Sequence, residues 1–247
     1  LNVLEPGDVA ATAGTSGVIY GVTDNPVADR ESRVNTFLHV TDRLESPRNG
    51  VLVCVNGTGR SYSWLRQLLS VGAAGQDVSY PYLNGLAEPV DVGSEGLVFH
   101  PFGNGAERIF QNRNLGASMI GLDLNRHGPG HTVRAVQEGI VFALNMGFDV
   151  LKSLGGSCDV VRAGHGNMFL SDLFTTAFAN TTGTAVELFD TDGAEGAARG
   201  AALGSGYYAS TEEAFRRLER LKVVEPRAGL RDSYLRAYED WADKLPV

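Results

Sequence analysis

Gly14-Thr15-Ser16-Gly17 decides how this sequence is interpreted, because the stretch lies between two apolar, strand-like runs. Val9–Ala13 precedes it and the run 18–22 follows it. The two glycines permit positive φ angles and a close approach of the backbone to a ligand. Exposed amides and two hydroxyls in such a turn suit phosphate oxygens. Taken alone, the stretch is more typical of an ordinary hairpin turn, so its meaning depends on the rest of the chain.

The composition is that of one globular domain, and we treat residues 1–247 as a single unit. The 247 residues are 43% hydrophobic and 20% charged, and no linker or repeat divides them. A net charge of −8 argues against nucleic acid and anionic lipid as partners. No apolar run approaches the roughly 20 residues of a membrane span, and no leader-like segment opens the chain. Because the chain starts at Leu1, close to an expected strand, we expect it to be part of a longer protein.

The two cysteines and five histidines show no metal-binding pattern. Cys54 and Cys158 lie in apolar, strand-like contexts, so we expect buried free thiols, a reducing compartment and a cytoplasmic protein. The histidines are scattered without a ligand motif. We therefore expect no metal site within this chain.

Hydrophobic periodicity predicts an α/β fold, a mixed β-sheet flanked by helices. Strands are expected at 9–13, 18–22, 34–40, 50–55, 96–101, 118–122, 159–161 and 186–189. Helices are expected at 60–71, 131–153 and 167–180, after the N-caps Asp192 and Ser210, and over 230–245. The Gly/Ala run 194–206 predicts close helix packing rather than a ligand site.

Three further glycine-centred segments, 56–60, 162–170 and 191–202, accompany the first turn. A strand that ends in small residues and opens a helix leaves N–H groups for an anion or a flat base, at the edge where α/β sheets bind ligands. Asn167 offers a donor and an acceptor to an adenine edge, although an N-cap is the simpler interpretation for Asn167 alone. The P-loop, the Gly-x-Gly-x-x-Gly fingerprint and the Gly-x-Ser-x-Gly elbow are missing from the sequence.

In their order along the chain, these motifs resemble the C-terminal domain of the FGGY carbohydrate kinases, in particular the xylulose-kinase-like branch. The resemblance covers nearly the whole chain. It rests on residues 14–17, Gly59 before Trp64-Leu65, Gly121-Leu122 with 131–139, 163–167 and 196–201. It implies the actin-like, ribonuclease-H-like ATPase fold, with two domains hinged around a cleft. It also implies ATP and Mg²⁺ as cofactors and transfer of a phosphoryl group to a sugar hydroxyl.

The resemblance also implies roles for individual residues. The implied nucleotide-binding positions are Gly14, Thr15, Ser16, Gly17, Gly59, Ala163, Gly164 and Asn167. Within that set, Thr15 and its neighbours would meet the β- and γ-phosphates, and Asn167 would border the adenine. Val18 falls where the family places a residue near the sugar.

The chain departs from the family pattern at several positions. The stretch 162–166, Arg-Ala-Gly-His-Gly, replaces the usual Gly-Gly-Gly run, so the shape of the adenine pocket is open. Thr132 and Gln137 stand at positions that are usually apolar in the second signature. Glu138 is expected to serve packing or hydrogen bonding on its helix rather than catalysis.

The largest departure is that nothing here matches the family's N-terminal domain. That domain holds most of the sugar pocket, the catalytic base and the Mg²⁺-facing carboxylates, so we expect no catalytic residue in this chain. Phosphoryl transfer depends on positioning nucleotide and acceptor together. The expected function is the ATP-binding half of a kinase for a ketose or polyol, most simply D-xylulose, with its own N-terminal domain as partner and little activity alone.

Other interpretations stay open from sequence alone. The domain is alternatively a non-enzymatic nucleotide-binding or interaction module of the same fold, or half of a kinase for ribulose, gluconate or glycerol. An unrelated α/β domain is disfavoured by five motifs in the family's order. A homodimer is a further possibility, because a surface left without its partner domain is prone to associate.

Overall fold

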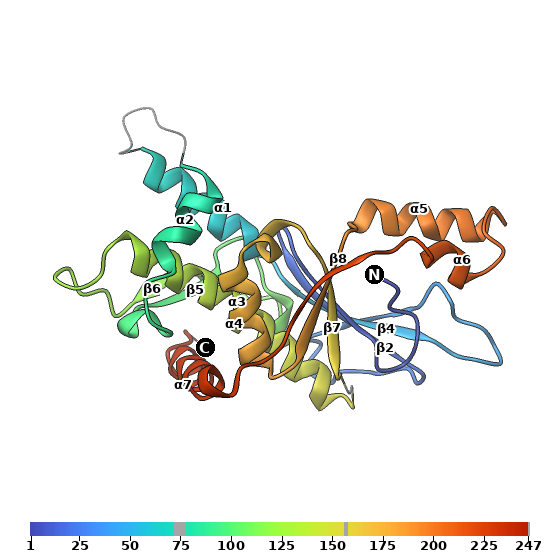
Figure 1. Ribbon diagram of the computed structural model, residues 1–247. Coiled ribbons are helices and arrows are strands. Elements are labelled where there is room, and N and C mark those ends of the chain that lie inside the picture. The colour runs from blue at the N-terminus through green and yellow to red at the C-terminus, as the bar shows by residue number, and fades with distance from the viewer. Residues whose placement is uncertain (72–77, 156–157, 247) are drawn as a thin grey trace.

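The computed structural model describes residues 1–71, 78–155 and 158–246, and its centre is a seven-stranded mixed sheet (Figure 1). The strand order is β3-β4-β2-β1-β7-β8-β9, with β1, β7 and β8 parallel to one another and the remaining pairs antiparallel. A separate two-stranded ladder pairs β5 with β6. The strands are β1 Val9–Ala13, β2 Gly17–Thr23, β3 Asn35–Leu38, β4 Asn49–Val55, β5 Val98–Phe102, β6 Gly116–Ile120, β7 Val160–Gly164, β8 Ala185–Phe189 and β9 Arg220–Val224.

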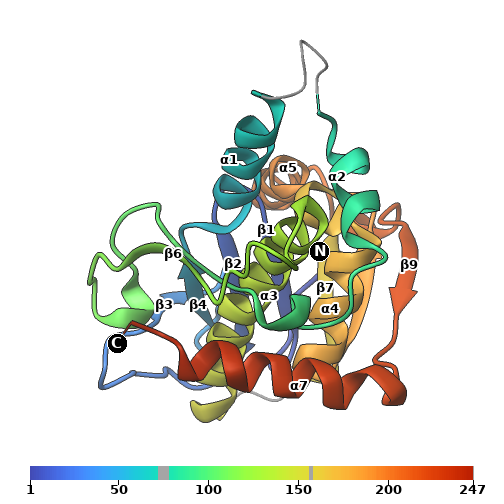
Figure 2. The same ribbon diagram turned by 90° about the vertical axis from the view of Figure 1, so that its left-hand side faces the viewer.

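The helices lie on both sides of this sheet. They are α1 Thr58–Ser70, α2 Tyr80–Ala87, α3 Pro129–Ser153, α4 Asp172–Thr182, α5 Gly193–Gly204, α6 Thr211–Phe215 and α7 Ala228–Asp243. Short 3₁₀ turns occupy Ser94–Gly96, Arg108–Phe110 and Asn167–Leu170. Figure 1 shows α3 and α4 on one side of the sheet and α5 and α6 on the other. Figure 2 shows α1 and α2 rising above the sheet and α7 crossing beneath it.

α3 is the central helix of the core. The apolar stripe predicted for this helix, with a period near 3.6 residues, is confirmed. Its members Val133, Ile140 and Leu144 are fully buried. The helix packs so closely that a side chain at Gly139 would collide with the Phe99 carbonyl oxygen. α7 seals the opposite end of this core, where Trp241 donates from Nε1 to the same Phe99 carbonyl oxygen at 2.8 Å.

Most expected elements are confirmed, with shifts of a few residues at their ends. Asp192 and Ser210 are N-caps whose side chains accept hydrogen bonds from the backbone N–H groups of Glu195 and Glu213. Cys54 and Cys158 are free thiols, but they are half-buried rather than buried. None of the described helices combines the length and apolar character that a bilayer crossing demands.

Two expectations were wrong, and two elements were missed. The helix expected over 167–180 is divided, because Ser171 ends the 3₁₀ turn and caps α4 by accepting from Phe174 N at 3.2 Å. α2 and β9 were not expected. Close packing of the Gly/Ala run is also wrong within the described structure, because no residue of α5 is buried.

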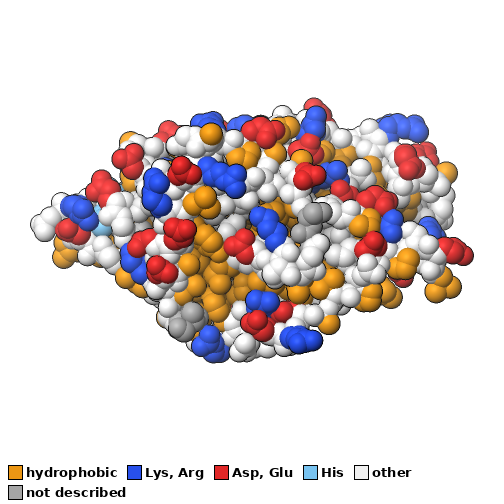
Figure 3. Space-filling model, turned by 90° about the horizontal axis from the view of Figure 1, so that it is seen from below, with side chains coloured by type: hydrophobic (Ala, Val, Ile, Leu, Met, Phe, Trp, Pro, Cys, Tyr) orange, Lys and Arg blue, Asp and Glu red, His pale blue; other side chains and the backbone are white. Residues whose placement is uncertain are grey.

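Charge is distributed in small groups over the face seen from below. Figure 3 shows acidic and basic side chains interspersed there, around a band of hydrophobic side chains across the middle. This face therefore offers no continuous basic track for a polyanion.

Candidate functional site

The main cavity of the described structure has a volume of about 840 Å³. Four segments line it: the β1–β2 turn, the start of α1, one side of α2, and the stretch from Asn167 to Asp172. Figure 2 shows α1 and α2 above β1 and β7, on the side of the sheet where this lining lies. Pockets for small molecules and cofactors commonly have this size and this place in an α/β sheet.

The β1–β2 turn is held against the first turn of α1. Gly59 N donates to the Gly14 carbonyl oxygen at 2.8 Å, and Arg60 N donates to the Thr15 carbonyl oxygen at 3.2 Å. In a trans peptide the N–H points opposite to the carbonyl, so the N–H groups of Thr15 and Ser16 face away from α1. Gly59 has to be glycine here, because a side chain would collide with the Gly14 carbonyl oxygen. The turn thus keeps its amides available for an anion.

A buried carboxylate supports this arrangement from behind. Glu107 is 0% exposed, and its two carboxylate oxygens accept from Asn56 N at 3.0 and 3.1 Å. Burial raises the pKa of Glu107 to about 7, although the N–H groups of Asn56 and Gly57 oppose that rise. The Asn56 side chain also donates to the Ala106 carbonyl oxygen at 2.7 Å. Glu107 therefore fixes the β4–α1 loop that delivers Gly59 to the pocket.

Asn167 faces the β1–β2 turn across the pocket. Its backbone has φ 53°, a left-handed conformation that asparagine tolerates better than most residues. A β-carbon on Gly14 would lie 3.8 Å from Asn167 Nδ2, so the side-chain amide of Asn167 lies directly beside the β1–β2 turn. Asn167 does not cap a long helix, because Ser171 caps α4. Strained backbone of this kind is frequent at ligand sites.

Four of the eight predicted nucleotide-binding residues line the cavity: Gly14, Thr15, Gly59 and Asn167. The Ser16 hydroxyl is turned towards the Asn56 carbonyl oxygen at 3.4 Å. Gly17 leaves no room for a side chain beside Thr58 and Leu144. Ser16 and Gly17 therefore support the turn from outside the cavity lining.

The other two predicted nucleotide residues and the predicted sugar residue also lie outside the lining. Ala163 is fully buried in β7, and a side chain at Gly164 would collide with the Thr191 carbonyl oxygen. Val18 is half-buried on the face opposite Ile19, because side chains alternate along β2. Its proximity to a sugar stays a prediction.

The structure adds α2 and the side chain of Arg60 to the site. Tyr80 of α2 stacks on Tyr62 of α1 with ring centroids 5.3 Å apart, and both rings line the cavity. Arg60 is exposed and belongs to the same lining, so it adds a basic residue to the site. The signal for α2 was present in the sequence: Ser79 is an N-cap that accepts from Tyr82 N at 3.3 Å, with Pro81 in the first turn.

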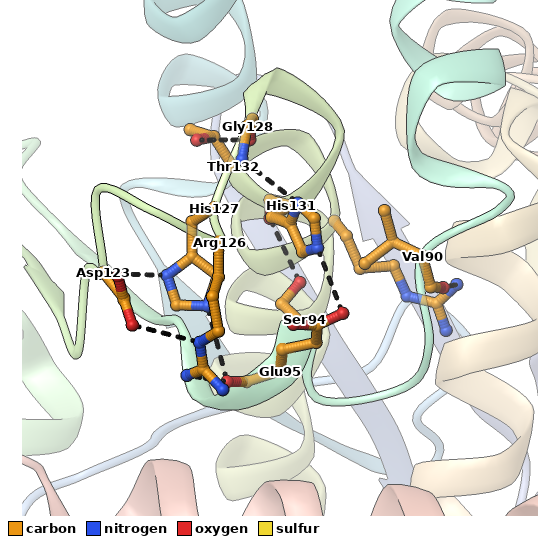
Figure 4. Close-up of polar contacts among 10 residues, drawn as sticks. Val90, Ser94, Glu95, Asp123, Arg126, His127, Gly128, His131 and Thr132 are labelled. Carbon is orange, nitrogen blue, oxygen red and sulfur yellow. Dashed lines mark hydrogen bonds and ion pairs between the residues drawn. The ribbon is translucent and has the colours of Figure 1, made fainter.

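A second polar cluster fastens the start of α3 outside this cavity (Figure 4). Residues 93–96 all have positive φ angles, of 84°, 47°, 53° and 90°. The Ser94 hydroxyl donates to the His131 carbonyl oxygen at 3.0 Å, and His131 Nε2 lies 3.5 Å from Glu95 Oε1. The described residues hold no group of three or more His, Cys, Asp and Glu side chains that could bind a metal ion.

Glu138 belongs to the deeper part of that anchor. It accepts from Arg134 Nε at 2.6 Å and from Gly93 N at 3.0 Å, and only 2% of the residue is exposed. Arg134 also donates to the Val90 carbonyl oxygen at 2.9 Å and to Tyr234 Oη at 2.9 Å. The expectation that Glu138 serves hydrogen bonding within the fold is confirmed.

Comparison with known proteins assigns this chain to a family. The sequence profile of the FGGY family of carbohydrate kinases, C-terminal domain, matches residues 9–209. The gluconokinase of Bacillus subtilis is 30% identical over 153 residues, which are 58% of this chain and 28% of that protein. The xylulose kinase of Haemophilus influenzae is 27% identical over 250 residues, 98% of this chain and 47% of that protein.

A solved structure shares the whole fold. The crystal structure of xylulose kinase from Rhodospirillum rubrum superposes with a TM-score of 0.82 at 25% identity, covering 98% of this chain and 47% of that one. The chain thus spans about half the length of that protein, or less in the case of the gluconokinase. The expected actin-like arrangement of a mixed sheet flanked by helices is confirmed. This chain belongs to the FGGY family of carbohydrate kinases, as a C-terminal domain.

Proposed function

We propose that this chain is the nucleotide-binding half of an ATP-dependent sugar kinase. The observation that carries the proposal is the 840 Å³ cavity, where the amides of the Gly14–Ser16 turn, the start of α1 and the Asn167 amide converge. ATP would supply the phosphoryl group for transfer, with Mg²⁺ accompanying its phosphates.

The residues present fit such a ligand from end to end. The β1–β2 turn offers amides and the Thr15 hydroxyl to phosphate oxygens, and Arg60 offers a cation beside them. The Asn167 amide has a donor and an acceptor for a base edge. Glycine at 14 and 59 keeps the backbone of both segments close to the ligand. In this proposal the chain binds and orients the nucleotide, and the base that accepts the sugar proton belongs to the other half of the kinase.

The exposed α5 supports the presence of another half. Its exposed positions are mostly glycine and alanine, with Glu195 among them, and no residue of α5 is buried. Small side chains permit a second surface to approach the helix closely. In this proposal that surface belongs to the N-terminal domain, whose closure brings the nucleotide and the sugar together and excludes water.

For the substrate we propose a ketose or polyol, with D-xylulose first. The long matches to xylulose kinases favour it, whereas the 30% identity to a gluconokinase makes gluconate the second candidate. A full-length protein assayed with both sugars separates them by their kcat/KM values.

Titration of Mg-ADP into this chain tests the nucleotide site. The wild type is expected to bind, and Asn167→Gly, which removes the side-chain amide but tolerates the left-handed backbone, is expected to lose most of that binding while keeping its fold. Equal binding by both proteins would remove Asn167 from the site. In a protein carrying both halves, Thr15→Val should lower kcat about 100-fold or more, because a donor to the transferred phosphate is lost. Unchanged turnover would contradict the role of Thr15.

A further inference from the structure

Gln137 of α3 lies directly behind the lining of the cavity and is 0% exposed. Its three side-chain partners come from three different elements: Tyr62 of α1, Asn84 of α2 and Ser171 at the start of α4. All three partners line the cavity. Figure 2 shows α3 running between these elements, with α1 and α2 above it and α4 beside it.

The hydrogen bonds of this cluster form one consistent chain. The Ser171 hydroxyl donates to Gln137 Oε1 at 2.8 Å and accepts from Phe174 N, so its direction is determined. Gln137 Nε2 donates to Tyr62 Oη at 3.0 Å and to Asn84 Oδ1 at 3.0 Å, which uses both of its hydrogens. Tyr62 Oη in turn donates to Asn84 Oδ1 at 2.6 Å.

Burying the Gln137 amide in the core costs free energy. A buried amide loses its hydration, and an apolar side chain would fill the same space without that penalty. An apolar residue would make no directional contacts. Hydrogen bonds, in contrast, fix the distance and angle between the groups that they connect. The amide of Gln137 therefore restrains α1, α2 and the end of the Asn167–Leu170 turn relative to one another.

We propose that Gln137 is a positioning residue for the nucleotide: it sets the spacing between α2 and the Asn167–Ser171 segment, and so the affinity of the cavity for a nucleoside diphosphate. The proposal rests on the nucleotide-binding function proposed above. Gln137 acts through Tyr62, Asn84 and Ser171 and does not touch the ligand itself.

The test compares Gln137→Leu with Glu138→Gln, a substitution at the next residue of the same helix in a network that lies outside the cavity. Gln137→Leu removes three hydrogen bonds within the protein and is expected, through the altered spacing of the lining, to weaken Mg-ADP binding roughly ten-fold. Glu138→Gln is expected to lower the unfolding midpoint and to change the dissociation constant less than two-fold. Ser171→Ala combined with Gln137→Leu should weaken binding by less than the product of the two single effects, since both changes break the Ser171–Gln137 hydrogen bond while each also removes contacts of its own.

Amide hydrogen exchange of the ligand-free proteins adds a readout that needs no nucleotide. In Gln137→Leu the amides of residues 167–171 should exchange about ten-fold faster, while those of β7 remain as in the wild type. Faster exchange in a chain that fails to bind Mg-ADP would support the role of Gln137 and count against the nucleotide function. Unchanged exchange together with wild-type affinity in Gln137→Leu would overturn the role of Gln137.

Discussion

The two buried polar networks of α3 lie within one turn of each other, yet they connect different parts of the molecule. Arg134 and Glu138 bond to the loop after α2 and to Tyr234 of α7, away from the cavity. Gln137 bonds to three residues that line the cavity. The first network holds a charge pair and joins elements of the fold, whereas the second holds neutral groups directly behind the proposed nucleotide site. Burial alone therefore does not reveal what a polar residue is for, but its partners do.

The largest effect is expected on the fold side of this comparison. Arg134→Met leaves the Glu138 carboxylate buried without its cation, which should lower the free energy of unfolding by about 3–5 kcal/mol. Mg-ADP affinity of the folded protein should stay within two-fold. Urea denaturation and calorimetric titration below the unfolding temperature measure the two quantities.

Arg126→Met is the matched control for that change. Arg126 pairs with Asp123 at 3.1 Å on the surface, so its loss should cost less than about 1 kcal/mol. Equal losses of stability in the two variants would show that the buried pair has no special role in the fold.

A smaller effect is expected at the cavity. Gly59→Ala places a methyl group against the Gly14 carbonyl oxygen, so stability should fall by about 1–3 kcal/mol. Mg-ADP binding should fall as well, because the β1–β2 turn is displaced. Gly85→Ala, in α2, meets nothing within 4 Å and should raise stability by about 0.5–1 kcal/mol. Thermal unfolding of both variants checks this; a tolerated Gly59→Ala would refute the close contact.

A further effect concerns pH. The pKa of Glu107 is raised from 4.5 to about 7 in the folded protein, so folding takes up a proton between those values. The associated stability is fully present below about pH 4.5 and is lost as the pH rises through 7. Glu107→Gln should therefore flatten the decline of the unfolding midpoint between pH 5 and 8. If the unfolding midpoint of Glu107→Gln declined as steeply with pH as that of the wild type, the decline would come from other titratable groups.

Local sequence signals predicted most of the fold. Hydrophobic periodicity located α3 and the strands of the sheet other than β9, and the glycines of the first turn indicated a segment that the structure places at a cavity. The break at Ser171 was missed because a serine N-cap inside an apolar stretch resembles an ordinary helix position. α2 was missed although Ser79 and Pro81 mark its start, because its eight residues give little periodicity.

Local sequence signals could not predict the contacts between residues that are distant in sequence. Gln137 meets Tyr62 and Ser171 across 75 and 34 positions of sequence, and Glu107 meets Asn56 across 51. No local pattern marks these pairs, because only the packing of several elements brings them together. The sequence could therefore single out the turn that borders the cavity but not the residues that support it.

Amide hydrogen exchange of the wild-type chain with and without Mg-ADP tests the central claim most directly, because it observes both sides of α3 at once. The account predicts slower exchange in residues 14–16, 59–63 and 167–171, and no change in residues 93–96 or α7. Protection that is absent from the cavity segments, or that appears only around residues 93–96, would contradict the assignment of the nucleotide site.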